Sequence, residues 1–237
     1  MISDNKYHYL TFLSWICSFI IVLYHYVSFF QIYEYQDNLY LNYLIIKQKY
    51  GANFVWLYWA ISGFIFTQTC LDLKNYEFKK FFFTLFKRFY PLHILTLLSI
   101  CMLQYTSYLF FGHTQLDFMN DFYHFLLHIF FASDWGLHQS FSFNAPVWFL
   151  SILIPVYFFA FFTIKFLKKI GIAFPIFIII LVYIINNDYQ YRTILNEMQK
   201  LALFNFMQCF IYFYLGSSIY FTFKKIISLN FNHSEHF

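Results

Sequence analysis

The sequence predicts an all-α, polytopic transmembrane helix bundle of about six spans with one further interfacial helix. Three observations favour this fold class. Hydrophobic residues make up 61% of the chain and charged residues only 11%, whereas soluble domains carry about 25% charge. Apolar runs near the length of about 20 residues that crosses a bilayer recur along the chain. Lys and Arg gather in clusters between these runs, as they do in the cytoplasmic loops of membrane proteins.

Six apolar runs are expected to be transmembrane helices, and the second and fifth are the shortest. The first run lacks a small-residue cleavage site, so we expect an uncleaved anchor rather than a signal peptide. Because no Gly/Ser-rich linker or internal repeat separates the runs, residues 1–237 are expected to form a single membrane-embedded domain. The six runs are Leu10–Phe30, Phe54–Cys70, Pro91–Phe111, Val147–Phe166, Ile170–Ile185 and Leu201–Phe223.

The apolar segment Phe122–Ala132 is about half as long as a span, which predicts an interfacial or re-entrant helix. It carries His124 and His128, four residues apart, a spacing that could hold a metal. No carboxylate or Cys completes this pair at a recognised spacing. We therefore expect no metal site here, and an amphipathic helix with two surface histidines instead.

Charge placement predicts the orientation. Basic clusters alternate with stretches poor in positive charge, and no Lys or Arg occurs between Phe89 and Ile164. By the positive-inside rule, both termini are expected in the cytoplasm, and the loop Gly112–Pro146 on the outer side of the cell (inner or plasma) membrane. The net charge of +4 is then explained by orientation in a lipid bilayer, without a nucleic-acid partner.

His25 is the first candidate functional residue, because an ionisable group within a lipid-soluble helix is costly and usually functional. At 100° per residue, Thr11, Ser14, Ser18 and His25 fall on one side of the first run. Such a polar stripe is expected to face other helices or water rather than lipid. A structural histidine bonded to a neighbouring helix is the alternative.

The basic segment before the third run is the second candidate site. Lys79, Lys80, Lys87 and Arg88 precede Pro91, which is expected to open the third helix. A helix N-terminus flanked by cations favours phosphate groups. The positive-inside rule alone also explains this cluster.

Two further segments have a distinctive pattern. The small residues of AISGF, Ala60–Phe64, allow close approach of helices inside the membrane. The segment SFNAPVWFLS, Ser142–Ser151, has Pro146 where a helix is expected to start and a Trp suited to the membrane interface.

Taken in order, five segments resemble motifs of the membrane acyltransferase 3 family, the O-acyltransferases that modify cell-surface carbohydrates. The resemblance extends from about Tyr7 to Phe223, with Phe149 in place of one motif Ser. The segments are VLYHY (Val22–Tyr26), FVWLYWAISGFIFT (Phe54–Thr67), KRFYPLH (Lys87–His93), FNAPVWFLS (Phe143–Ser151) and YFYLGSSIY (Tyr212–Tyr220).

The resemblance implies an acyltransferase that moves an acyl group, usually acetyl, from acyl-CoA to a hydroxyl of a cell-surface carbohydrate (O-acetylation). His25 matches the catalytic histidine of the family, and Arg88, together with Lys87, would face the CoA phosphates. Acyl-CoA would be a donor substrate, and no permanently bound cofactor is implied.

The chain departs from the family at two polar positions and in length. Ser14 stands where the family usually has Arg, eleven residues before the histidine, and Leu153 stands where it usually has Glu. About six spans, against about ten in the family, imply truncation at the C-terminal end. Two alternatives therefore stay open: a non-catalytic member that keeps the fold, and a membrane carrier or scaffold without acyl transfer.

Overall fold

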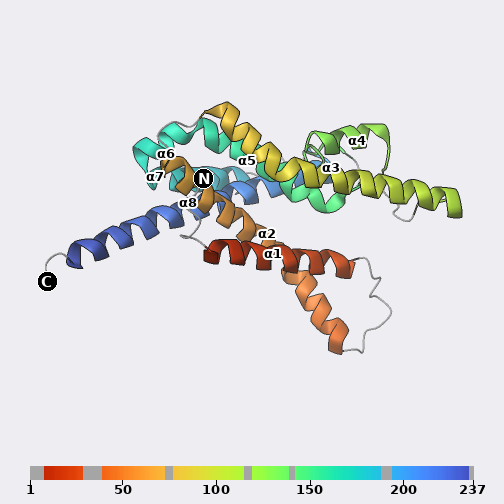
Figure 1. Ribbon diagram of the computed structural model, residues 1–237, viewed down its shortest axis with the longest axis horizontal. Coiled ribbons are helices and arrows are strands. Elements are labelled where there is room, and N and C mark those ends of the chain that lie inside the picture. The colour runs from red at the N-terminus through yellow and green to blue at the C-terminus, as the bar shows by residue number, and fades with distance from the viewer. Residues whose placement is uncertain are drawn as a thin grey trace. The chain divides into compact units, whose positions relative to one another are not determined.

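The computed structural model describes residues 8–28, 39–72, 77–114, 119–138, 142–187 and 194–234 (Figure 1). Every regular element within these ranges is a helix, which confirms the all-α fold class. The helices are α1 (His8–Ser28), α2 (Leu39–Asp72), α3 (Phe78–Phe111), α4 (Phe122–Ile129), the short 3₁₀ helix η2 (Ala145–Val147), α5 (Trp148–Phe162), α6 (Ile164–Ile170), α7 (Ala173–Asn187) and α8 (Glu197–Ser234).

Within the described residues, four helical stretches are long and apolar enough to cross a membrane, which indicates an integral membrane protein. They are Gly51–Leu71, Phe78–Phe111, Ala145–Phe162 and Glu197–Ile227. The first predicted run forms α1, but its apolar part Tyr9–Leu23 is shorter than a span.

The fifth predicted run, Ile170–Ile185, corresponds mainly to α7, which begins at Ala173 after a sharp bend. Helices α6 and α7 are bent by 120°, so this pair adds a fifth span only if the two together count as one. The bend falls at Gly171, whose φ of +65° is incompatible with a continuing right-handed helix. The fourth run also ends earlier than predicted, at Phe162.

Contacts within the chain gather into two units. The first contains α1, α2, α6, most of α7 and the C-terminal part of α8. The second contains α3, α4, η2, α5, the end of α7 and the first part of α8.

In the first unit, α1 packs on α2, and α2 crosses α8 at two glycines. A Cβ on Gly63 would overlap the Phe213 carbonyl oxygen, and one on Gly216 would overlap the Ala60 carbonyl oxygen. Next to this crossing, the Thr67 hydroxyl donates to Ser217 Oγ at 2.8 Å. The expectation of close helix approach at AISGF is therefore confirmed.

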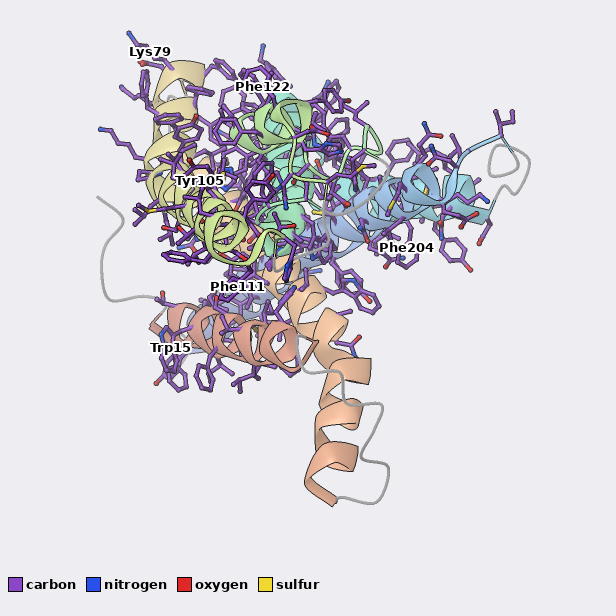
Figure 2. All side chains as sticks on the ribbon, turned by 90° about the vertical axis from the view of Figure 1, so that its right-hand side faces the viewer. Trp15, Lys79, Tyr105, Phe111, Phe122 and Phe204 are labelled. Carbon is purple, nitrogen blue, oxygen red and sulfur yellow. The ribbon has the colours of Figure 1, made fainter. Side chains whose placement is uncertain are left out.

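In the second unit, the first half of α3 lies antiparallel to α5. Phe81 and Phe161 stack with their ring centroids 4.7 Å apart, and Asn144 Nδ2 donates to Thr96 Oγ1 at 2.9 Å. These two contacts fix the register between the helices. The second half of α3 extends past α4 and α5, with large apolar side chains such as Leu103 and Phe110 exposed (Figures 1 and 2).

The prediction that Pro91 opens the third helix is wrong, because Pro91 lies inside α3. Apolar residues at helical spacing before it, such as Phe81, pack on α5 and hold this part of α3 helical. Pro91 lacks an N–H for the Lys87 carbonyl, four residues earlier. Pro155 has the same effect in α5, where the Ser151 carbonyl instead accepts a 2.9 Å hydrogen bond from Trp135 Nε1.

Candidate functional site

His25 lies in the last turn of α1 and is half-buried. Its Nδ1 is 2.8 Å from the Ile21 carbonyl oxygen, one helical turn earlier. Because a carbonyl oxygen only accepts, Nδ1 carries the hydrogen. In the neutral ring the lone pair is then on Nε2, which is the nitrogen able to take a proton from a substrate.

The polar stripe of α1 is bonded within the helix itself. Ser14 Oγ donates to the Leu10 carbonyl at 2.8 Å, and Ser18 Oγ to the Ser14 carbonyl at 2.9 Å. Such bonds to the preceding turn allow hydroxyl groups to reside on an apolar helix. The serine hydroxyls of the stripe therefore have hydrogen-bond partners within α1 and do not require a neighbouring helix.

Lys87 and Arg88 are exposed on α3, in the second unit. The Arg88 guanidinium carbon lies 5.1 Å from the centroid of the Phe89 ring, a cation–π distance. Among the described residues, no carboxylate lies within ion-pair distance of either cation. Both charges are thus left for solvent or an anionic ligand.

The register between α3 and α5 places these cations at an unexpected depth. Arg88 is seven residues from Phe81 and eight from Thr96, so it lies level with Leu153 of α5. Leu153 is at the middle of the apolar stretch Ala145–Phe162. If α5 crosses the bilayer, Lys87 and Arg88 lie near the middle of its length, where an unpaired charge is expensive.

The position of Arg88 in α3 corrects the prediction that a helix N-terminus helps these cations to attract phosphate. Arg88 is the eleventh residue of α3, so it is not at a helix N-terminus, and the helix dipole adds little there. Any attraction for phosphate comes from the side-chain charges. His25 belongs to the first unit, and the two cations belong to the second.

Ser14 and Leu153, the two positions that differ from the resembled family, carry no charge. One makes a local hydrogen bond and the other packs in the core. The Ser14 hydroxyl is used by the Leu10 carbonyl. Leu153 is fully buried in the core of the second unit. Neither residue supplies a charged group to His25 or Arg88.

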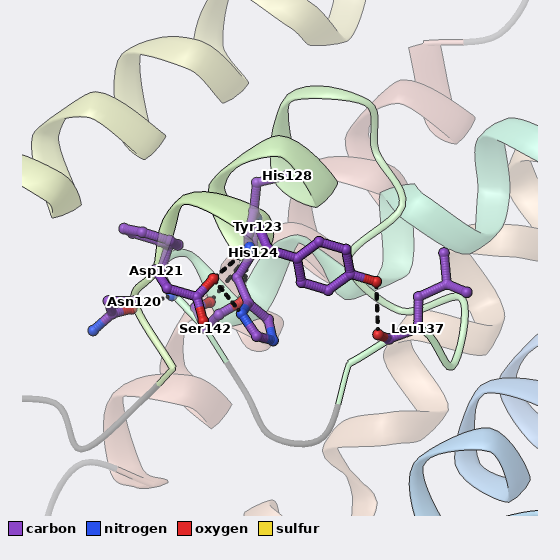
Figure 3. Close-up of polar contacts among 8 residues, drawn as sticks. Asn120, Asp121, Tyr123, His124, His128, Leu137 and Ser142 are labelled. Atoms are coloured by element: carbon purple, nitrogen blue, oxygen red, sulfur yellow. Dashed lines mark hydrogen bonds and ion pairs between the residues drawn. The ribbon is translucent and has the colours of Figure 1, made fainter.

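The second unit contains a cluster of buried histidines, of which the sequence pointed only to His124 and His128 (Figure 3). Asp121 caps α4, accepting bonds from the backbone N–H of His124 and from His124 Nδ1, both through Oδ1. His128 Nε2 lies 3.0 Å from the Ser142 carbonyl oxygen. His124 and His128 are only 5% and 1% exposed, so the prediction of two surface histidines is wrong.

Two more buried histidines and a carboxylate extend this cluster. His93 Nε2 lies 2.8 Å from the His128 carbonyl oxygen, which links α3 to α4. His138 Nε2 lies 4.0 Å from Asp134 Oδ1, and Asp134 Oδ2 accepts a 2.8 Å bond from Asn205 of α8. His93 and His128 are 35 residues apart and Asp134 and Asn205 are 71 residues apart, so residue spacing alone could not reveal these two contacts.

Burial sets the protonation of the cluster. It lowers the pKa of His128 to about 4, with a further contribution from neighbouring His93, so this ring is neutral at pH 7. Burial also lowers the pKa of His138 and raises that of Asp134 to about 6. His128 and His138 are therefore neutral imidazoles near a carboxyl group whose pKa of about 6 is close to physiological pH.

A small cavity of about 10 Å³, enough for one water molecule, lies between His128, Ser133, Asp134, His138 and Ser142. Within the described residues, the Nδ1 atoms of His128 and His138 and the Ser133 hydroxyl have no hydrogen-bond partner. Three or more His, Cys, Asp or Glu side chains arranged as metal ligands are not found among the described residues. The cavity thus suits a polar molecule of the size of water.

No family model, curated protein or solved structure matches the chain. The resemblance to the acyltransferase 3 family thus stays a prediction based on five short segments. The structure gives three of them local roles. Gly63 and Gly216 form the α2–α8 crossing, and Asn144 bonds to α3.

Asp134→Asn should stabilise the protein at pH 8 and have little effect at pH 4. The pKa of Asp134 is raised in the folded state, so its stabilising contribution is present below the ordinary pKa of 3.8 and lost as the pH rises through about 6. The difference corresponds to about 3 kcal/mol at pH 8. Thermal unfolding of both proteins in detergent at the two pH values measures it.

Asp121→Asn is the matched control with the opposite sign. Hydrogen bonds from His124 lower the pKa of this exposed carboxyl group, so its charged form stabilises the fold at pH 8. The Asn variant should therefore be less stable than the wild type at pH 8. A lower melting temperature of Asp134→Asn at pH 8 would show that the buried carboxylate is stabilised there by an ionic partner.

Proposed function

We propose that the protein is a membrane O-acyltransferase, which moves an acyl group from acyl-CoA to a hydroxyl of a cell-surface carbohydrate. It would reside in the cell membrane with both termini in the cytoplasm, as the positive-inside rule predicts. One observation carries most of this proposal: two cations without a described carboxylate partner lie level with the middle of an apolar span. An anionic ligand would neutralise them, and acyl-CoA provides phosphates.

In the proposed reaction, His25 is the general base. Its Nε2 takes the proton of the acceptor hydroxyl as the oxygen attacks the thioester carbonyl. The C–S bond then breaks, the ester forms, and the CoA sulfur takes the proton back from the imidazolium. The bond between His25 Nδ1 and the Ile21 carbonyl supports this role, because it orients the ring and places the hydrogen on Nδ1, so that Nε2 is the basic nitrogen of the neutral ring.

A non-catalytic protein with the same fold is the second candidate. Ser14 and Leu153 favour it, because both are engaged in packing or local bonds and neither supplies the charge that the resembled family usually has there. Such a protein could still bind CoA at Lys87 and Arg88. Turnover separates the two candidates.

Arg88→Ala should raise the KM for acetyl-CoA by about tenfold to a hundredfold, because a charged hydrogen bond to phosphate is lost. Arg88→Lys should recover only part of the loss, since Lys keeps the charge but not the two-pronged geometry of Arg. The measurement uses purified protein in lipid nanodiscs with labelled acetyl-CoA, following acyl transfer or slow hydrolysis.

Lys200→Ala is the matched control, since it also removes one positive charge from the second unit. Lys200 already pairs with Glu197 at 2.7 Å, so its loss should leave KM unchanged. Equal KM values in the wild type and Arg88→Ala would remove Arg88 from donor binding. Arg88-dependent CoA binding without any turnover would establish the non-catalytic candidate.

A further inference from the structure

An apolar pocket of about 310 Å³ opens between α3, α5 and the end of α4, in the second unit. One face of α3 forms a wall, with Phe82, Phe86 and Phe89 at helical spacing. Ile154 and Phe158 of α5 line the opposite side. From Phe82 to Tyr90 the pocket follows α3 for about 12 Å, at 1.5 Å per residue.

The inner end of the pocket is closed by Phe131. Its ring stacks on His93 at 4.3 Å and meets Tyr90 edge-on at 5.9 Å. Its φ of +53° is a rare conformation for a bulky residue. Phe131 thus separates the apolar pocket from the buried histidine cluster, and an uncharged chain fits this pocket better than a polar group.

Positive charge lies beside this pocket on α3. The Arg88 guanidinium covers the Phe89 ring, which lines the pocket wall. Lys79 is three residues before Phe82 on the same face of α3, and its side chain extends outward (Figure 2). A ligand that suits both features has an anionic head and an apolar tail.

We propose that this pocket binds the acyl chain of the donor, and that the donor carries a medium-length fatty acyl chain rather than acetyl. This inference rests on the proposed function, which supplies CoA as the anionic head. The positive charge beside the pocket favours a CoA thioester over a neutral lipid. The volume exceeds by far what an acetyl group needs.

The test compares the binding of acetyl-CoA and octanoyl-CoA to the full-length protein in nanodiscs. Each buried methylene strengthens binding by about fourfold, so octanoyl-CoA should bind at least about tenfold more tightly. Ile154→Trp fills the pocket and should bring the octanoyl to acetyl affinity ratio close to one. Ile184→Trp makes the same change on an exposed position of α7 and should keep the wild-type ratio.

Phe82→Ala tests the pocket without overfilling it, since this side chain is 40% exposed. It lengthens the pocket and should raise the affinity ratio of dodecanoyl-CoA to octanoyl-CoA. This second variant decides the question if Ile154→Trp does not fold.

Each other outcome overturns the inference in a recognisable way. Equal affinities for acetyl-CoA and octanoyl-CoA in the wild type would exclude the acyl pocket while leaving CoA binding intact. An octanoyl preference that survives in Ile154→Trp would show that the chain enters the bilayer instead. A phospholipid that co-purifies and that octanoyl-CoA does not displace would make the pocket a lipid site. Failure of any CoA thioester to bind would reject the proposed function itself.

Discussion

His25→Ala is expected to lower the rate of acyl transfer by about 10²- to 10⁴-fold, the usual contribution of a general base. The side chain is half-buried at the end of α1, and its Nδ1 bonds the carbonyl of the preceding turn. Removing it should leave the helix formed. The measurement is the kcat with labelled acetyl-CoA, with size-exclusion elution and melting temperature as evidence that the variant is folded.

Ser18→Ala is the matched control for this change. Ser18 lies on the same polar stripe and also bonds the carbonyl four residues before it, at 2.9 Å. Its loss should not alter kcat. His25→Gln keeps a hydrogen-bond donor but cannot accept a proton at neutral pH, so it should be as inactive as His25→Ala. Wild-type rates in either His25 variant would reject the catalytic role.

The fold class was predictable because transmembrane helices can be recognised in a sequence by the length and apolarity of their segments. Four of the six predicted runs coincide with long apolar helical stretches. Helix ends were less predictable, because packing decides them. α3 continues back to Phe78 through Pro91, since phenyl rings on this part pack on α5 and compensate for one lost backbone hydrogen bond.

The candidate site was predictable only where chemistry is local. His25, Lys87 and Arg88 were identified because charged or ionisable groups are rare on apolar helices. The buried histidine cluster was not identified. His128 meets Ser142 fourteen residues later, and Asp134 meets Asn205 of α8. In the sequence only His124 and His128 form a recognisable pair, and the fold brings Ser142 and Asn205 to this cluster from later in the chain.

Pro155 shows how a residue's local effect on a helix can be used by a contact from another part of the chain. It lacks the N–H that would bond the Ser151 carbonyl, so this carbonyl is left for a side chain. The indole N–H of Trp135 donates to this carbonyl at 2.9 Å, and the Ser151 hydroxyl oxygen accepts a hydrogen bond from the Asp134 backbone N–H at 3.1 Å. Ser151 thus holds the segment that carries Asp134 against α5, a role that the predicted helix start at Ser142–Ser151 does not include.

Gly63→Ala is expected to destabilise the protein by about 3 kcal/mol, although Ala favours helix by about 1 kcal/mol in the absence of contacts. The added Cβ would overlap the Phe213 carbonyl oxygen, a backbone atom that moves only if α8 moves. The helices must then separate, which also weakens the Thr67–Ser217 hydrogen bond. Unfolding in detergent, followed by circular dichroism against SDS concentration, measures the change.

Gly112→Ala separates this clash from the general effect of replacing a glycine. A Cβ at Gly112 meets no atom within 4 Å, but its φ is +74°. It should therefore cost only about 1 kcal/mol of backbone strain. Gly216→Ala should match Gly63→Ala, because its Cβ would overlap the Ala60 carbonyl on the other side of the same crossing. A Gly63→Ala protein as stable as the wild type, or more stable, would mean that α2 and α8 do not touch at these glycines.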